Sequence, residues 1–383
     1  MAAFGTFAAL LPEFIDGWAL SKTQAGWLNG IFFAGYVAAV PVLVSMTDRV
    51  SPKKVYGVSM ILTLIASLGF ALLAQGFWTA LALRFLAGIG LAGTYMPGMK
   101  ILGDRLQGKA QSRAVAFYAS HFSIGWAFSL FVSGEMSAWM DWRWIYGVLS
   151  MGSILAFLSV WLLIPRDDPR DFTAPNTKLL DFRPVLRCRP AMGYVLAYAV
   201  HNFELFAARS WIVVFLVFAQ SLQPDGAPWW SATMIATVFA LVGMPASVLG
   251  NEFAARFGRH RVVTLVMLTS TLIACGLGFA AQLPFWVLFC ICMVYGATIT
   301  GDSAAITSGV VSVAPEGYRG STMAVHAFFG FIGSFGGPLI FGIVLDLFGG
   351  GQTVNSWGAA FIVMGLVVAL GPVALAALKS PNT

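Results

Sequence analysis

Residues 191–221 read AMGYVLAYAVHNFELFAARSWIVVFLVFAQS, a stretch that is apolar apart from polar residues near its centre and at its end. A helix needs about 20 apolar residues to cross the ~30 Å hydrocarbon core of a bilayer. This stretch is long enough to do so. It therefore predicts a transmembrane helix, and the polar residues inside it are the first candidates for a functional site.

The rest of the chain has the same character. Hydrophobic residues make up 58% of the 383 residues and charged residues only 10%, which is far from the composition of a soluble globular domain. Apolar stretches separated by short polar connectors predict an all-α membrane protein with twelve transmembrane helices. These helices are expected near residues 1–15, 24–46, 55–74, 77–101, 113–136, 143–164, 191–221, 228–254, 262–282, 284–309, 320–346 and 355–377.

The longest polar stretch covers residues 165–190 and is rich in Arg, Asp and Pro. Its composition and its place between the sixth and seventh predicted helices favour a cytoplasmic linker. The predicted domains are accordingly an N-terminal six-helix bundle at 1–164 and a C-terminal six-helix bundle at 191–383.

Most of the 22 Lys and Arg residues fall in the loops on one side of the predicted helices. By the positive-inside rule this side is cytoplasmic, and both termini of the full-length protein are expected there. The net charge of +6 could suggest nucleic-acid binding, but that requires a basic stripe on a soluble face. We therefore expect a multi-pass protein of the cytoplasmic (inner) membrane, with the lipid bilayer and not nucleic acid as its partner.

The first predicted helix is short. It begins at Met1 and reaches the polar residues Glu13 and Asp16 after roughly 20 Å of helix. We expect this helix to be truncated, with its cytoplasmic half upstream of Met1. A signal peptide is the alternative, although the segment lacks a basic start and a convincing cleavage site.

The two predicted bundles share an internal repeat. An offset of 208 residues pairs Phe77 with Phe285, Gly88 with Gly296, Gly93 with Gly301 and Gly125 with Gly333. In the loop after the second helix the offset is 207, and it pairs Arg49 with Arg256 and Val55 with Val262. Matches in the same order across four consecutive helices indicate a parallel pseudo-repeat, which is expected to place a solute site between the halves near the midplane.

Two loops carry related basic motifs. Asp48, Arg49, Lys53 and Lys54 follow the second predicted helix and resemble the signature G-x-x-x-D-R-x-G-R-K, with Ser51 at a position where glycine is usual. The loop after the eighth predicted helix keeps its basic residues but has alanine at the acidic position. The residues of this second loop are Arg256, Gly258, Arg259 and Arg261.

Arg84, Gly88 and Gly90 resemble a second signature, R-x-x-x-G-x-G. Together with the repeat, these motifs identify a resemblance to the major facilitator superfamily over essentially the whole chain. The resemblance implies that the two basic loops form a cytoplasmic gating motif and that Arg84 takes part in substrate binding or coupling. A salt bridge from Arg84 to Glu13 or Glu135 is the structural alternative. The G-P motif of drug antiporters is absent from the fifth helix, which argues against drug efflux.

Other motifs argue against enzymes and cofactors. Gly88, Gly90 and Gly93 match a dinucleotide motif but lie inside an apolar span, where tight helix packing explains them. Lys109 ends a segment similar to a P-loop, but Ala110 replaces the Ser or Thr that binds magnesium. The four cysteines show no zinc-type spacing, and no hydrolase motif occurs. We therefore expect no cofactor, no metal and no enzymatic activity.

The polar cluster in the seventh predicted helix consists of His201, Asn202, Glu204 and Arg209, close to the middle of the membrane. Ionisable residues there cost roughly 2.5–3.5 kcal/mol each and usually face a bundle interior or an aqueous cavity. Helical spacing puts Asn202 and Arg209 on one side and His201 with Glu204 on another. The first side could meet an anionic substrate while the second carries a proton. A structural hydrogen-bond network is the alternative.

Asp302, in the tenth predicted helix, is a further candidate for substrate binding or proton relay, and its repeat counterpart is Thr94. His121 and His326 are single polar residues in packed helices. We expect neighbouring backbone carbonyls to satisfy these two histidines.

The pattern predicts a secondary active transporter, a permease that moves a small solute by alternating access. The mixture of Arg, His and acidic residues favours a small organic or inorganic anion moved in symport with a proton or another coupling ion, by a monomer. Proton-driven efflux of amphipathic compounds is the alternative within this class. A membrane enzyme, or a non-transporting sensor or assembly factor on the same fold, are the alternatives outside it.

Overall fold

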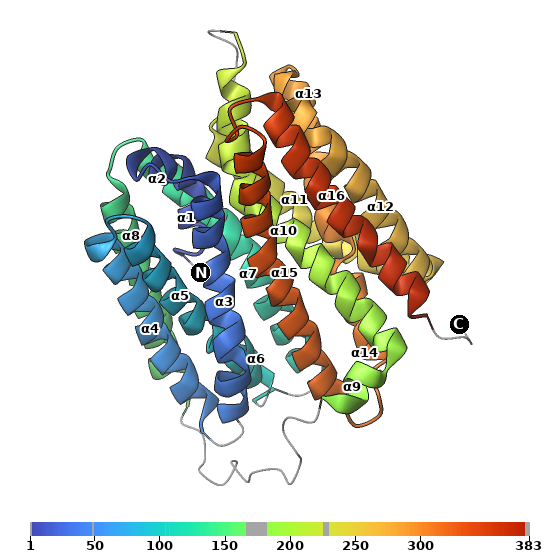
Figure 1. The fold of residues 1–383 in the computed structure, drawn as a ribbon. Helices are drawn as coiled ribbons and strands as arrows, with labels where there is room; N and C mark the ends of the chain where they lie inside the picture. The colour runs from blue at the N-terminus through green and yellow to red at the C-terminus, as the bar shows by residue number, and fades with distance from the viewer. Residues whose placement is uncertain are drawn as a thin grey trace. The chain divides into compact units, whose positions relative to one another are not determined.

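The computed structural model describes residues 2–47, 50–103, 105–106, 108–165, 182–224 and 230–379, without the side chains of 44, 45, 103, 108–117 and 119–121. Over these residues the chain is helical and contains no β-strand, which confirms the all-α prediction (Figure 1). The chain forms two compact units. Unit 1 is Met1–Leu10 with Ile31–Leu179, and unit 2 is Leu11–Gly30 with Leu180–Thr383.

Ten helices in the described part of the chain are long and apolar enough to cross a membrane, and they match ten of the twelve predicted spans. The first predicted span is instead two short helices, α1 (Thr6–Ala9) and α2 (Leu11–Gly17), which are interrupted at Leu10. The fifth is α7 (Gly108–Ser137), whose first half lies largely among the side chains that are not described. The predicted linker at 165–190 also lies mostly outside the described residues.

Unit 1 contains α1, the later part of α3 (Lys22–Met46) and α7, together with the helices α4 (Pro52–Leu73), α5 (Phe77–Ala92), α6 (Tyr95–Gly103) and α8 (Trp142–Leu163). α4 packs against α5 and α8, and α1 packs against α7. The contact between α1 and α7 is polar, because Ser133 Oγ donates to Thr6 Oγ1 at 2.9 Å and the Gly5 amide donates to Ser129 Oγ at 2.9 Å.

Unit 2 contains α2, the start of α3 and the helices α9 (Arg183–Arg187), α10 (Arg189–Ser221), α11 (Ala232–Phe257), α12 (Arg259–Leu277), α13 (Phe285–Gly301), α14 (Ser303–Ser312), α15 (Arg319–Leu347) and α16 (Val354–Ala377). A short 3₁₀ turn, Gly278–Gln282, extends α12. α10 packs mainly against α15 and α16. The grouping of 11–30 with unit 2 differs from the predicted domain boundaries, which stay a prediction.

Local sequence signals explain where several of these helices begin. Asp141 accepts a hydrogen bond from the Arg143 amide at 2.8 Å and starts α8, while Thr353 and Ser356 form a capping box at the start of α16. Such caps satisfy amide groups that have no partner within the helix. Gly258 has φ +94° and separates α11 from α12, in a backbone conformation that favours glycine.

The repeat predicted from sequence recurs in the packing of each unit. A Cβ on Gly88 would overlap the Phe32 carbonyl, and a Cβ on Gly296 would lie 2.9 Å from the Phe239 carbonyl. Gly88 and Gly296 are paired at offset 208, and Phe32 and Phe239 at offset 207. Equivalent glycines therefore let equivalent helices approach closely in both units, as small residues do in membrane bundles.

Candidate functional site

α10 is the most enclosed of the ten spanning helices. In its most apolar stretch 89% of the residues are buried, whereas the share does not exceed 44% in any of the other nine. Every residue from His201 to Leu216 is buried. The predicted polar cluster therefore lies inside unit 2 and does not face lipid. A polar cluster in this position is costly unless its members are paired or bind a ligand.

His201 is paired with Asp302. His201 Nδ1 lies 2.8 Å from Asp302 Oδ1, and the two side chains are 1% and 4% exposed. Neither atom has a hydrogen bond of good geometry, so the contact is close but imperfectly aligned, and it is an ion pair when His201 is protonated. Asp302 occupies the break between α13 and α14, a break that the continuous span predicted at 284–309 did not anticipate.

Glu204 lies one turn further along α10 and is 2% exposed. Its Oε1 accepts a hydrogen bond from Ser270 Oγ at 2.7 Å, from α12, and another from Tyr295 Oη at 3.1 Å, from α13. Both of these donors are neutral hydroxyl groups. Ser270 and Tyr295 were not among the residues predicted from the sequence, although a hydroxyl inside an apolar span is a signal that could have suggested them.

The rings of His201, Tyr198 and His326 form a stack. The Tyr198 ring lies 3.8 Å from the His326 ring and 5.8 Å from the His201 ring, at 16° in both cases. His326 Nε2 lies 3.5 Å from Thr307 Oγ1. The expectation that a backbone carbonyl satisfies His326 is not met, and the side chain of His121 lies outside the described residues.

Three buried nitrogen atoms near this stack have no hydrogen bond of good geometry among the described residues: His201 Nε2, Asn202 Nδ2 and His326 Nδ1. Asn202 Nδ2 lies against Gly330 on α15, where a Cβ would approach it to 2.5 Å. Buried polar groups in native proteins nearly always have partners. Unsatisfied nitrogens grouped around one stack therefore indicate a place where a ligand or water binds.

The two candidate arginines lie in different units. Arg209 is 5% exposed in unit 2, with its guanidinium carbon 5.5 Å from the centre of the Phe206 ring. Arg84 is in unit 1, with its guanidinium carbon 4.2 Å from the Phe7 ring and 5.3 Å from the Phe32 ring. Guanidinium groups over aromatic faces gain cation–π stabilisation when they are removed from water.

In the first basic loop, Asp48 and Arg49 lie outside the described residues. Lys53 is 6% exposed, and its Nζ donates to the Trp161 carbonyl at 2.9 Å and also to the Ile164 carbonyl. These carbonyls lie at the end of α8, so Lys53 stabilises the negative end of that helix. Lys54 is exposed.

In the second basic loop, Gly258 ends α11 and Arg259 begins α12. The guanidinium carbon of Arg256 lies 5.5 Å from the Phe257 ring. Arg259 Nε is buried without a hydrogen-bond partner, and Arg261 is exposed. The gating role expected for both loops stays a prediction.

No group of three or more His, Cys, Asp or Glu side chains in the described part of the chain could hold a metal ion. Within the same residues, the strongest ionisable arrangement is the His201–Asp302 pair with Glu204 beside it. Such an arrangement can bind and release protons, while the unsatisfied nitrogens can donate to or accept from a bound solute.

Among known proteins, the chain is 23% identical to a sphingosine-1-phosphate transporter of Xenopus tropicalis, over 96% of this chain and 76% of the relative. It is 27% identical to an uncharacterized transporter of Bacillus subtilis, over 46% of this chain. A putative metabolite transport protein of Haemophilus influenzae is 23% identical over 63% of this chain. The matches span 45% of the Bacillus and 60% of the Haemophilus protein.

Two solved structures share the fold. A bacterial homolog of the human lysosomal transporter Spinster, in an inward-facing and occupied conformation, has a TM-score of 0.73 and 16% identity, over 98% of this chain and 91% of that one. A nucleoside transporter has a TM-score of 0.82 and 14% identity, over 99% and 96%. The family model described as Major Facilitator Superfamily matches residues 1–338 and 233–383. Because these matches cover the chain from end to end, the chain belongs to the Major Facilitator Superfamily of membrane transporters.

Proposed function

We propose that this chain is a proton-coupled secondary transporter that carries a small anionic solute across the cytoplasmic membrane by alternating access. The observation that carries the proposal is the buried contact of 2.8 Å between His201 Nδ1 and Asp302 Oδ1. An ionisable pair at this depth is costly to keep, and in membrane proteins such pairs often belong to proton or substrate pathways.

One proton changes the net charge of this pair. With the imidazole protonated, His201 and Asp302 are neutral together, whereas loss of the proton leaves a buried carboxylate without a counter-charge. A buried uncompensated charge is strongly unfavourable, so the deprotonated pair favours a conformation in which water reaches it. The proton thereby biases the equilibrium between two conformations, which is the requirement for coupling.

Glu204 provides a second position where a proton changes buried charge. Its carboxyl group accepts from the hydroxyls of Ser270 and Tyr295, and such neutral donors do not cancel its charge. We assign Glu204 to proton coupling together with the His201–Asp302 pair.

The unsatisfied nitrogens support an anionic solute. His201 Nε2, Asn202 Nδ2 and His326 Nδ1 are grouped around Tyr198, and Asn202 donates through its amide. Carboxylate or phosphate oxygens are suitable acceptors for such donors. We propose that Arg209 in unit 2 and Arg84 in unit 1 attract the negative charge of this solute.

The second candidate function is proton-driven efflux of an amphipathic compound. It is favoured by the similarity to sphingosine-1-phosphate transporters over nearly the whole chain. Both candidates involve a solute with an anionic group. In the second candidate the solute also has an apolar tail and is exported.

Uptake into proteoliposomes tests the proposal. Purified protein is reconstituted, and radiolabelled small carboxylates, inorganic phosphate and an amphipathic phosphate are offered with and without a pH gradient. We expect accumulation of a small anion that requires the gradient and is lost in Glu204→Gln. Accumulation that does not respond to the gradient would remove proton coupling, and gradient-dependent export of the amphipathic phosphate alone would favour the second function.

The proposal also includes the organisation of the protein. We propose that both termini of the full-length chain are cytoplasmic, that the transporter is a monomer, and that the bundles at 1–164 and 191–383 move about a central site. No enzymatic step is part of this mechanism.

A further inference from the structure

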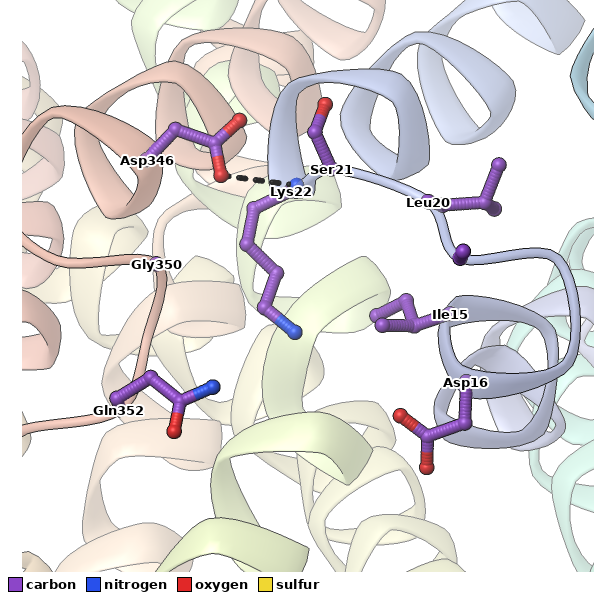
Figure 2. Close-up of a pocket in the computed structure, with 9 residues that line it drawn as sticks. Ile15, Asp16, Leu20, Ser21, Lys22, Asp346, Gly350 and Gln352 are labelled. Atoms are coloured by element: carbon purple, nitrogen blue, oxygen red, sulfur yellow. Dashed lines mark hydrogen bonds between the residues drawn. The ribbon is translucent and has the colours of Figure 1, made fainter.

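The start of α3 is held by an acidic residue far away in sequence. Asp346, near the end of α15, accepts a hydrogen bond from the Lys22 amide at 3.0 Å and from the Thr23 amide at 2.7 Å (Figure 2). Ser21 and Gln24 cap the same helix end locally, through bonds of 3.0 and 3.1 Å. The first amides of a helix have no partner within the helix, and a carboxylate there also meets the positive end of the helix dipole.

Below this cap, α3 and α15 touch mainly through backbone. A Cβ on Gly26 would lie 2.5 Å from the Pro338 carbonyl, and a Cβ on Gly30 would lie 2.5 Å from the Phe335 carbonyl. Small residues allow this close approach. One pair of large side chains also meets there, because the Trp27 and Phe335 rings have centroids 5.5 Å apart. Two hydrogen bonds of this contact lie at one end, on Asp346.

α3 is a continuous helix, yet its parts belong to different units. Residues up to Gly30 group with unit 2 and residues from Ile31 group with unit 1, while the one proline inside the helix, Pro41, lies well beyond that boundary. A rearrangement between the units must therefore bend a regular helix or separate residues 22–30 from α15. Bending would break several backbone hydrogen bonds in hydrocarbon, whereas separation breaks the two bonds to Asp346.

A cavity of about 440 Å³ lies beside this contact, and the Lys22 side chain extends into it (Figure 2). Two of its lining residues, Ala19 and Gly350, lie in turns with positive φ, and Gly349 and Gly351 flank the second of them. Ala19 has φ +47°, and Gly349, Gly350 and Gly351 have φ values of +107°, +69° and +75°. Water in this cavity can solvate both the Asp346 carboxylate and the α3 amides once they separate, which lowers the cost of separation.

We propose that Asp346 is a latch that holds the N-terminal part of α3 against α15, and that the latch opens once in each transport cycle. By the predicted topology the latch is on the extracytoplasmic side, so its opening exposes the site to that side. This inference rests on the alternating-access mechanism proposed above, but not on the identity of the solute or on proton coupling.

The test uses the full-length protein with one cysteine, Ala25→Cys, on a cysteine-free background. Ala25 lies on α3 and is fully buried. The rate of labelling by a membrane-impermeant maleimide is measured without solute or gradient. Loss of two hydrogen bonds in Asp346→Ala is expected to raise this rate about tenfold. Asp346→Asn keeps one acceptor and should give an intermediate rate.

Two control variants separate the latch from simple fraying of a helix end. Ser21→Ala weakens the same end of α3 without touching α15, and Asp141→Ala removes an acidic cap from α8 in unit 1. Both should leave the labelling rate within about twofold of the parent. A rate in Asp346→Ala equal to that of the parent or of Ser21→Ala would overturn the proposal.

A cross-link tests whether the cycle needs the latch to open. The rings of Trp27 on α3 and Phe335 on α15 have centroids 5.5 Å apart, so cysteines at these positions can be joined by a short bifunctional reagent. A cleavable cross-link should block transport and its cleavage should restore it. Normal transport by the cross-linked protein would also overturn the latch. If Asp346→Ala is labelled faster but the parent protein shows no gradient-driven uptake, the latch is supported and only proton coupling is refuted.

Discussion

The fourth spanning segment of each unit breaks at the same place in the repeat, but the two breaks have different chemistry. In unit 1 the segment divides into α5 and α6 beside Thr94, whose hydroxyl donates to the Leu91 carbonyl at 2.8 Å. In unit 2 it divides into α13 and α14 at Asp302, whose carboxylate is paired with His201. The break thus belongs to the shared architecture, while the ionisable group belongs to one repeat.

Close helix packing also combines a shared backbone arrangement with different side chains in the two units. The Gly93 and Gly301 pair precedes the two breaks, and their Cβ positions would meet Ser59 and Val266, which are related by offset 207. Equivalent backbone positions are therefore kept while the side chains around them diverge. This asymmetry predicts that equivalent substitutions lower stability in both units where backbone packing dominates, whereas their effects on transport differ strongly between the units.

The largest effect is expected at the two breaks. Asp302→Asn removes the counter-charge of a buried histidine, and breaking such a pair from one side typically costs about 3–5 kcal/mol. We expect gradient-driven uptake to fall by at least about a hundredfold, whereas Thr94→Val should retain most of it. Initial uptake rates in proteoliposomes measure both. Comparable losses in the two variants would show that the breaks matter for their backbone and not for their ionisable group.

A double-mutant cycle should detect the pairing directly. His201→Gln and Asp302→Asn are combined, and the free energies of unfolding of the four proteins are compared. We expect a coupling of about 2 kcal/mol, because each single variant leaves one buried group without its partner. The cycle of Thr94→Val with Tyr118→Phe should give a coupling near zero, since Tyr118 Oη donates to the backbone carbonyl of Thr94. A zero coupling for His201 and Asp302 would contradict the ion pair.

The difference between local and tertiary information explains what the sequence could predict. Hydropathy is local, so ten spans were predicted correctly, and the repeat identified Gly88 and Gly296 because helices touch at these residues. The break at Asp302 contains no proline, and the polar residues around it, which include Thr300 and Ser303, did not mark the end of the predicted span. The partners of His201 and Glu204 come from α12, α13 and the break itself, and only tertiary packing brings them to α10.

Asn202 and Glu204 lie on different sides of α10. Asn202 lies against Gly330 of α15, while Glu204 meets hydroxyls from α12 and α13. What spacing could not supply is the identity of the neighbour on each side. The roles of all these residues, including Arg84 and Arg209, stay predictions until transport is measured.

A smaller effect is expected from the paired glycines. Gly88→Ala would force the new Cβ into the Phe32 carbonyl, whereas in Gly296→Ala the Cβ would lie 2.9 Å from the Phe239 carbonyl and ring. Overpacking of this kind typically costs about 1–3 kcal/mol, and we expect Gly88→Ala to lie near the upper end and Gly296→Ala near the lower end. Thermal unfolding in detergent checks the order. A larger loss in Gly296→Ala would show that α3 and α5 can move apart more easily than α11 and α13.

The smallest effect concerns the first basic loop. Lys53 donates to carbonyls at the end of α8 and is buried, whereas the neighbouring Lys54 is exposed. Lys53→Gln should lower the free energy of unfolding by about 1–2 kcal/mol, because a charged donor is lost from the end of a helix. Lys54→Gln should change it by less than about 0.5 kcal/mol.

If Lys53→Gln left stability unchanged but slowed transport, the gating role suggested by the motif would outweigh the capping role. Equal losses of stability in both variants would instead indicate that the loop responds to its total charge and not to the bonds made by Lys53.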